Sequence, residues 1–96
     1  MTQKITVFTT TNCVRCDWVK RLFDKNNVEY EAINCQTDLE PRPEFDDLAP
    51  VDFVIQNYAR EMPVVTVEDQ DDKWWFSGIK SHEIDTIIDK YSGTSN

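Results

Sequence analysis

A strand–helix–strand pattern in the first third of the chain places the strongest constraint on its fold. Residues 4–10 (KITVFTT) are rich in β-forming residues with apolar side chains on both faces, which is typical of a strand in the centre of a sheet. Residues 14–26 follow with apolar residues at helical spacing, and residues 28–34 (VEYEAIN) alternate as a second strand. Because a helix returns the chain along the sheet, the two strands are predicted to pair in parallel.

The segment 35–58 combines a polar connection with a helical pattern. The connection contains Pro41 and Pro43, and helical spacing resumes over residues 44–58. Pro50 lies inside this pattern, and a proline within a helix removes a hydrogen bond and clashes with the preceding turn. We therefore predict either two short helices or one kinked helix.

The last third of the chain indicates a β-hairpin followed by a helix. Residues 64–68 and 73–77 have the composition of two antiparallel strands joined by a four-residue loop, DQDD. Residues 81–91 have the clearest amphipathic spacing, with Ser81 as the predicted N-cap. The order β-α-β-α-β-β-α predicts an α/β fold with a four-stranded mixed sheet flanked by three helices, or by four if residues 44–58 form two.

Composition and charge limit the classes of partner. The 96 residues suit one domain, which we assign to residues 1–91, with residues 92–96 as a flexible C-terminal tail. A net charge of −8 argues against binding nucleic acid or an anionic membrane surface. No apolar run approaches the roughly 20 residues of a membrane span, and the N-terminus lacks the pattern of a signal peptide. We expect a cytoplasmic protein and a monomer.

Two of the three cysteines, Cys13 and Cys16, form a C-x-x-C motif at the predicted strand-to-helix turn. In a cytosolic protein this arrangement favours redox chemistry over a structural disulfide. Cys13 opens the helix, where unpaired N–H groups and the positive end of the helix dipole stabilise a thiolate, and Arg15 adds a nearby positive charge. We predict that Cys13 is the nucleophile and that Cys16, on the buried face, is the resolving thiol.

Other roles for the cysteines stay open at this point. A metal or iron–sulfur site would need further ligands, for which Cys35 and His82 are the remaining candidates, and we predict no metal. Cys35 is expected to be buried and inert, with a regulatory or dimerising thiol as the alternative, and His82 is expected at the surface. A third alternative is a binding protein with incidental cysteines, which would act through its acidic surface and Trp18.

Three motifs carry a resemblance to a known family, and it covers residues 4–91. They are CVRC after ITVFTT, MPVV at residues 62–65, and WWFSGIKSHEI at residues 74–84. Together they resemble the glutaredoxin-like proteins of the thioredoxin fold, and most of all the NrdH-redoxin branch, which carries a C-V-x-C site and a W-S-G-F-like segment. The resemblance implies a thioredoxin-like fold and a dithiol–disulfide oxidoreductase that needs no cofactor beyond its cysteine pair.

The same resemblance implies a substrate groove beside the cysteine pair. Pro63 would be the family's cis-proline, although the residues alone equally allow a proline that only begins a strand. The backbone of Met62 would pair with a substrate strand, and Ser77 and Gly78 would form the turn that lines the site. The predicted groove comprises Asn12, Trp18, Met62, Pro63, Ser77 and Gly78.

The resemblance also implies the partners. The electron acceptor would be a protein disulfide, that of ribonucleotide reductase, and the donor would be thioredoxin reductase with electrons ultimately from NADPH. Glutathione is the alternative donor. Members that use glutathione carry a Gly-Gly turn followed by an acidic residue, and the family tends to have a Lys-Pro pair before the first cysteine. Here the turn is Ser77-Gly78 without an aspartate, and Thr10 and Thr11 replace the Lys-Pro pair. Both departures argue against glutathione as the donor and leave thioredoxin reductase as the expected one.

Overall fold

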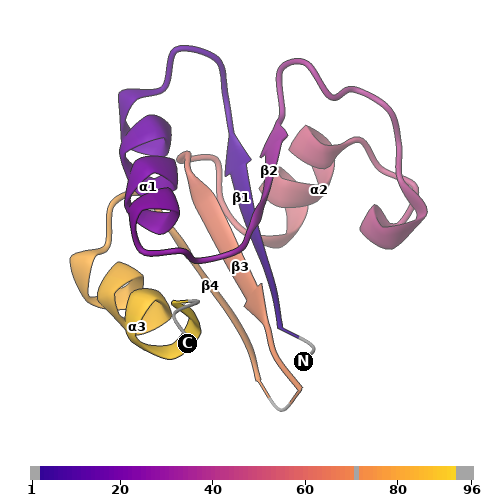
Figure 1. Ribbon diagram of the computed structural model, residues 1–96. Coiled ribbons are helices and arrows are strands. Elements are labelled where there is room, and N and C mark those ends of the chain that lie inside the picture. Colours follow the sequence, from indigo (N-terminus) through magenta and orange to yellow (C-terminus); the bar gives the residue numbers. More distant parts are fainter. Residues whose placement is uncertain (1–2, 71, 93–96) are drawn as a thin grey trace.

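A four-stranded mixed sheet runs through the centre of the computed structural model, which describes residues 3–70 and 72–92 (Figure 1). The strands are β1 (Lys4–Thr9), β2 (Glu31–Asn34), β3 (Val64–Glu68) and β4 (Lys73–Ser77). They lie in the order β2-β1-β3-β4. β1 pairs in parallel with β2 and antiparallel with β3, and β3 pairs antiparallel with β4. The predicted parallel pair and the predicted hairpin are both confirmed.

The described residues form three α-helices that cover the two faces of the sheet. α1 (Val14–Lys25) and α3 (Ser81–Tyr91) lie on one face, and α2 (Pro50–Asn57) lies on the other (Figure 1). A short 3-10 helix, η1 (Pro43–Phe45), precedes α2. The order of elements and the mixed sheet confirm the α/β architecture predicted from the sequence.

The central strand β1 separates two hydrophobic cores. On the face covered by α1 and α3, Ile5 and Val7 pack with side chains of both helices. On the α2 face, Phe8 packs with Val54 and Val64. Because β1 contributes side chains to both cores, its position is well defined. The loop that follows its carboxyl end therefore begins at a fixed position and leads into α1.

The proline-containing segment forms two separate elements. Pro43 is the first residue of η1, and Pro50 is the first residue of α2. A proline at the first helical position loses no hydrogen bond, because that N–H has no partner within the helix. Pro50 therefore begins a helix rather than kinking one, and of the two predicted alternatives the pair of short helices is confirmed.

Two boundaries differ from those predicted. β2 begins at Glu31 rather than at residue 28, and Val28 forms an isolated antiparallel bridge with Ser92. Ser92 was predicted to belong to the flexible tail, but this bridge and the hydrogen bond from its N–H to the Ile88 carbonyl (3.1 Å) hold it to the domain. The other predicted tail residues, 93–96, lie outside the described residues.

The start of α3 also lies one residue from its predicted place. Lys80 is the N-cap residue, with an extended backbone, and Ser81 is the first helical residue. The Lys80 carbonyl accepts the first helical hydrogen bond, from the Ile84 N–H at 2.9 Å. The prediction of Ser81 as the N-cap is therefore wrong, because the helix already begins after Lys80.

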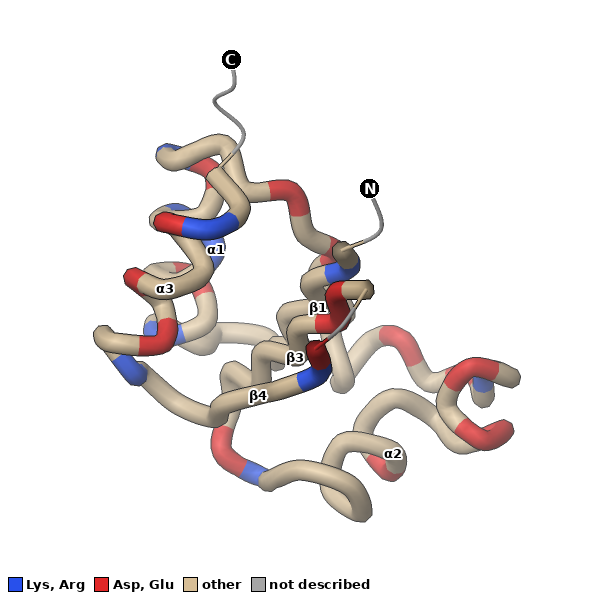
Figure 2. The backbone as a smooth tube through the Cα atoms, turned by 90° about the horizontal axis from the view of Figure 1, so that it is seen from below, with Lys and Arg blue, Asp and Glu red and all other residues tan. Residues whose placement is uncertain are grey.

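Many of the acidic residues lie on two segments of the chain. Figure 2 shows Asp and Glu along the connection that leads to α2 and around the β3–β4 hairpin. In Figure 1 this hairpin lies at the opposite end of the sheet from the loop that enters α1. None of the described helices combines the length and apolar character needed to cross a membrane.

Candidate active site

The loop that precedes Cys13 is held in place by the residues after β2. The Thr11 backbone N–H donates to the Gln36 side-chain carbonyl at 3.0 Å, and the Asn34 side-chain amide donates to the Thr11 hydroxyl at 3.3 Å. Asn12 completes the turn in the left-handed region, with φ of 58° and an exposed side chain. Asparagine tolerates this conformation better than most residues. The turn therefore presents Cys13 at the end of β1 in a defined orientation.

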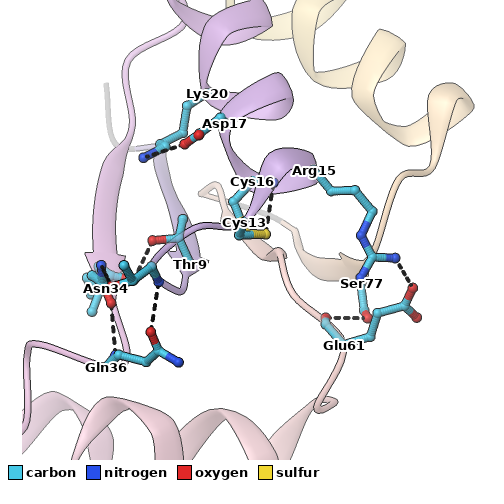
Figure 3. Close-up of a disulfide and its surroundings, with 12 residues drawn as sticks. Thr9, Cys13, Arg15, Cys16, Asp17, Lys20, Asn34, Gln36, Glu61 and Ser77 are labelled. Atoms are coloured by element: carbon cyan, nitrogen blue, oxygen red, sulfur yellow. Dashed lines mark hydrogen bonds and ion pairs between the residues drawn. A yellow bond between two sulfur atoms is a disulfide. The ribbon is translucent and has the colours of Figure 1, made fainter.

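Cys13 occupies the N-cap position of α1. Its backbone is extended, its carbonyl accepts the Asp17 N–H at 3.0 Å, and its sulfur accepts the Cys16 N–H at 3.1 Å. Cys13 is partly exposed, whereas Cys16 has 0% exposure within the core on the α2 face. The two form a disulfide with their Cα atoms 5.2 Å apart (Figure 3). The predicted positions of both cysteines are confirmed.

This geometry favours a thiolate at Cys13 once the disulfide is reduced. A sulfur at the N-cap receives a backbone N–H and lies at the positive end of the helix dipole. Such sites bring the pKa of a cysteine thiol into the range of about 3.5–7.5, against about 8.5 for a free cysteine. Cys13 is partly exposed, while Cys16 is fully buried and is bonded to Cys13 in the disulfide.

Arg15 is directed away from the two sulfurs. Its guanidinium donates to the Glu61 carboxylate at 2.9 Å, and both side chains are about half exposed (Figure 3). The sequence assigned Arg15 to the stabilisation of the Cys13 thiolate. The contact present here is with Glu61, and a role of Arg15 at the thiolate stays a prediction. The features that the structure shows beside the Cys13 sulfur are the Cys16 N–H and the end of the helix.

The segments predicted to form the groove lie side by side. The Met62–Pro63 peptide bond is cis, in agreement with the resemblance. The Gly78 N–H donates to the Pro63 carbonyl at 2.8 Å, and the Ser77 hydroxyl donates to the Glu61 carbonyl at 2.8 Å. Met62 belongs to the same hydrophobic cluster as Cys16, and Cys13 packs against that cluster. These hydrogen bonds join the two segments next to the cysteine pair.

Trp18 is the outlying member of the predicted groove. It lies on α1 beyond Cys16 and is 41% exposed, as expected for a residue off the buried stripe. Val14, in the first turn of the same helix, is 82% exposed. A role for Trp18 in contacts with a partner stays a prediction.

The sequence analysis missed Glu61. Its carboxylate binds Arg15, its backbone carbonyl accepts the Ser77 hydroxyl, and a Cβ added at Gly78 would meet its Oε2 atom at 2.8 Å. Its position directly before the Met-Pro pair was the available signal. Arg15, however, lies 46 residues away along the chain, and no periodic pattern links them.

Cys35 shares the hydrophobic cluster of Cys16, whereas His82 lies in the first turn of α3. Cys35 is 2% exposed, and burial, with a further contribution from the charge of Asp38, raises the pKa of its thiol to about 11. The prediction that Cys35 is buried is confirmed, and so is the prediction that His82 is exposed. Within residues 3–70 and 72–92, no group of three or more His, Cys, Asp or Glu side chains is arranged to hold a metal ion.

Comparison with known proteins assigns the family. The glutaredoxin family model matches residues 5–71. The chain is 30% identical over 80 residues to the glutaredoxin-like protein NrdH of Lactococcus lactis subsp. lactis (strain IL1403), covering 83% of this chain and 93% of that protein. This chain belongs to the glutaredoxin family. The NrdH protein of L. lactis subsp. cremoris (strain MG1363) matches with the same identity and coverage, 30%, 83% and 93%.

Solved structures agree with this assignment. NrdH-redoxin from Escherichia coli, described as a glutaredoxin-like protein with a thioredoxin-like activity profile, has 28% identity and a TM-score of 0.56, with 86% of this chain and 92% of that chain covered. Thioredoxin f2 from Chlamydomonas reinhardtii, at 16% identity and a TM-score of 0.62, covers 93% of this chain and 78% of its own and shares the fold. The predicted thioredoxin-like fold and the resemblance to the NrdH branch are both confirmed. This glutaredoxin-like chain is a thiol–disulfide oxidoreductase.

Proposed function

We propose that the protein uses its dithiol to reduce the disulfide of a partner protein. Ribonucleotide reductase would be the partner that accepts the electrons, and thioredoxin reductase would return the protein to its dithiol form. The observation that carries this proposal is the N-cap position of Cys13, with its sulfur on the Cys16 N–H and with Cys16 buried beneath it. The similarity to NrdH proteins supports the choice of both partners.

The proposed reaction proceeds by two thiol–disulfide exchanges. The Cys13 thiolate attacks one sulfur of the substrate disulfide, and the other sulfur leaves as a thiolate and takes up a proton. Cys16 then loses its proton and attacks the Cys13 sulfur, which releases the second substrate thiol and leaves the Cys13–Cys16 disulfide. The substrate gains two electrons from the protein dithiol and two protons, one from Cys16 and one from solvent, and the reductase restores the dithiol with two electrons from NADPH.

The remaining groove residues have roles in binding under this proposal. The backbone of Met62, before Pro63, would pair with an extended substrate segment, and Ser77 and Gly78 would border it. Asn12 and Trp18 would contact the partner from the turn and from α1. A dithiol that must stay reduced also needs a reducing compartment, and for this reason we assign the protein to the cytoplasm.

A two-donor assay tests this proposal. Reduction of insulin disulfides is measured with thioredoxin reductase and NADPH, and in parallel with glutathione, glutathione reductase and NADPH. Turnover with thioredoxin reductase and little with glutathione is the expected result. Turnover that depends wholly on glutathione would overturn the assignment of the donor, and no turnover with either donor would overturn the proposed reaction.

Substitution of the resolving thiol separates the two steps. In Cys16→Ser, the first exchange proceeds but the second cannot, so a disulfide between Cys13 and the substrate should accumulate and be detectable by mass spectrometry. Cys35→Ser is the matched control, because it removes a buried thiol that the reaction does not use. Normal turnover by Cys16→Ser would refute the resolving role.

A further inference from the structure

The Arg15–Glu61 ion pair borders the site on the side of the Ser77–Gly78 turn. Arg15 belongs to the first turn of α1, two residues after Cys13, and reaches across to the segment before Met62 (Figure 3). The ion pair therefore connects the element that carries the cysteines to the segment proposed to bind substrate.

Glu61 is held in this position from three directions. Arg15 Nη1 lies 2.9 Å from its Oε2 atom, and the Ser77 hydroxyl donates to its backbone carbonyl at 2.8 Å. The carboxylate also lies directly against Gly78, where an added Cβ would come within 2.8 Å of Oε2. Gly78 has φ of 76° and leaves the space that the carboxylate occupies. The orientation of Glu61 is therefore set by the Ser77–Gly78 turn as well as by Arg15.

At this rim the guanidinium of Arg15 is already paired with the Glu61 carboxylate. Without Glu61, Arg15 would present a free guanidinium at this rim, and guanidinium groups bind carboxylates well. Lys80 reaches the same turn, but its ammonium donates to the Ser77 carbonyl at 3.1 Å. A substrate that carries carboxylates must therefore compete with Glu61 for Arg15.

We propose that Glu61 is a specificity-determining residue, which withholds Arg15 from carboxylate-bearing disulfides and so disfavours small anionic substrates, the class to which glutathione disulfide belongs. This inference rests on the proposed function and adds a residue-level cause for its choice of partner. Arg15 and Glu61 are both about half exposed, so their ion pair is weak enough to exchange with a substrate group. We expect discrimination of roughly two- to fivefold in rate, the range set by exposed ion pairs. Specificity arises from features that disfavour a competitor as well as from contacts with the preferred partner.

The test uses three small disulfides that differ in charge. They are dithiodipropionate, which is anionic, cystamine, which is cationic, and hydroxyethyl disulfide, which is neutral. The reduced protein is mixed with each, and the loss of protein thiols is followed over a single turnover. Each reaction converts the protein dithiol and one disulfide into the protein disulfide and two small thiols, so the rates are directly comparable.

The expected results differ in sign between the two members of the pair. Glu61→Gln frees Arg15 and should raise the ratio of the anionic to the neutral rate by roughly two- to fivefold. Arg15→Gln frees the Glu61 carboxylate and should lower that ratio. It should also raise the ratio of the cystamine rate to the neutral rate. The double variant carries neither charge and should return both ratios close to the wild-type values. A structural change alone would alter all three substrates alike.

Matched controls make the same change in charge elsewhere. Glu40→Gln and Arg21→Gln alter exposed residues that are not part of the pair. Unchanged ratios in Glu61→Gln and Arg15→Gln, or equal changes in the controls, would overturn the inference. Failure of the wild-type protein to reduce insulin disulfides with either donor would instead overturn the proposed function, so the two failures are distinguishable.

Discussion

Cys13 and Cys35 show how the same side chain becomes reactive in one place and inert in another. Cys13 lies at the N-cap of α1, partly exposed, with a backbone N–H on its sulfur. Cys35 lies after β2 in the core of the α2 face, 2% exposed, and the pKa of its thiol is raised to about 11 by burial and by Asp38. The difference between the two residues indicates that the surroundings of a cysteine, here the end of a helix, determine the reactivity of its thiol.

Removing each thiol in turn is the strongest test of the difference between Cys13 and Cys35. Cys13→Ser should lose disulfide reduction by about a thousandfold or more, because a hydroxyl cannot form the mixed disulfide. Cys35→Ser should retain it, because this thiol has no part in the exchange. Insulin reduction with thioredoxin reductase measures both variants. Comparable losses in the two would show that the distinction between the sites is false.

Alkylation of the reduced protein compares the reactivity of the Cys13 and Cys35 thiols directly. At pH 7 a thiol with a pKa of about 11 is almost entirely protonated, so iodoacetamide should label Cys13 at least about a hundredfold faster than Cys35. Labelling of Cys35 should rise with pH towards 11, and labelling of Cys13 should already be near its plateau at pH 8. Peptide mass spectrometry gives both rates. Equal rates in the native protein would argue against the account.

Alkaline pH tests the burial of Cys35 through stability. Between about pH 9 and pH 11 the unfolded chain releases this proton while the folded chain retains it, so the free energy of unfolding should fall over this range. Cys35→Ala removes this contribution, and its stability should fall less steeply with pH. Urea unfolding at several pH values measures the slope. Tyr30 and Tyr91, whose pKa values are raised to about 12 mainly by burial, remain in both proteins and act as an internal control. Identical slopes would mean that Cys35 is not held protonated.

The smallest expected effect concerns the turn beside the reactive site. Gly78→Ala introduces a Cβ at φ of 76° and 2.8 Å from the Glu61 carboxylate, and should cost about 1 kcal/mol in the free energy of unfolding. Chemical denaturation measures this cost. In a Glu61→Ala background the substitution should cost less, since only the backbone strain remains. An equal cost in both backgrounds would show that the carboxylate does not occupy this space.

Local sequence patterns predicted much of this molecule because their causes are local. The β-forming run at residues 4–10 predicted β1, and the position of the C-x-x-C motif predicted a thiol at the start of α1. Pro50 was ambiguous, because the same residue begins a helix or kinks one according to where the helix starts. The charge pairing of Arg15 was not predictable, since Glu61 approaches it only through the packing of β3 beside the site.

Titration of the Cys13 thiol tests the central claim most directly. The ultraviolet absorbance of the thiolate is followed against pH in the reduced protein, and the titration of Cys13→Ser is subtracted from it. The account predicts a midpoint below about 7.5, as for other thiols at helix N-termini. A midpoint near 8.5, that of a free cysteine, would contradict it.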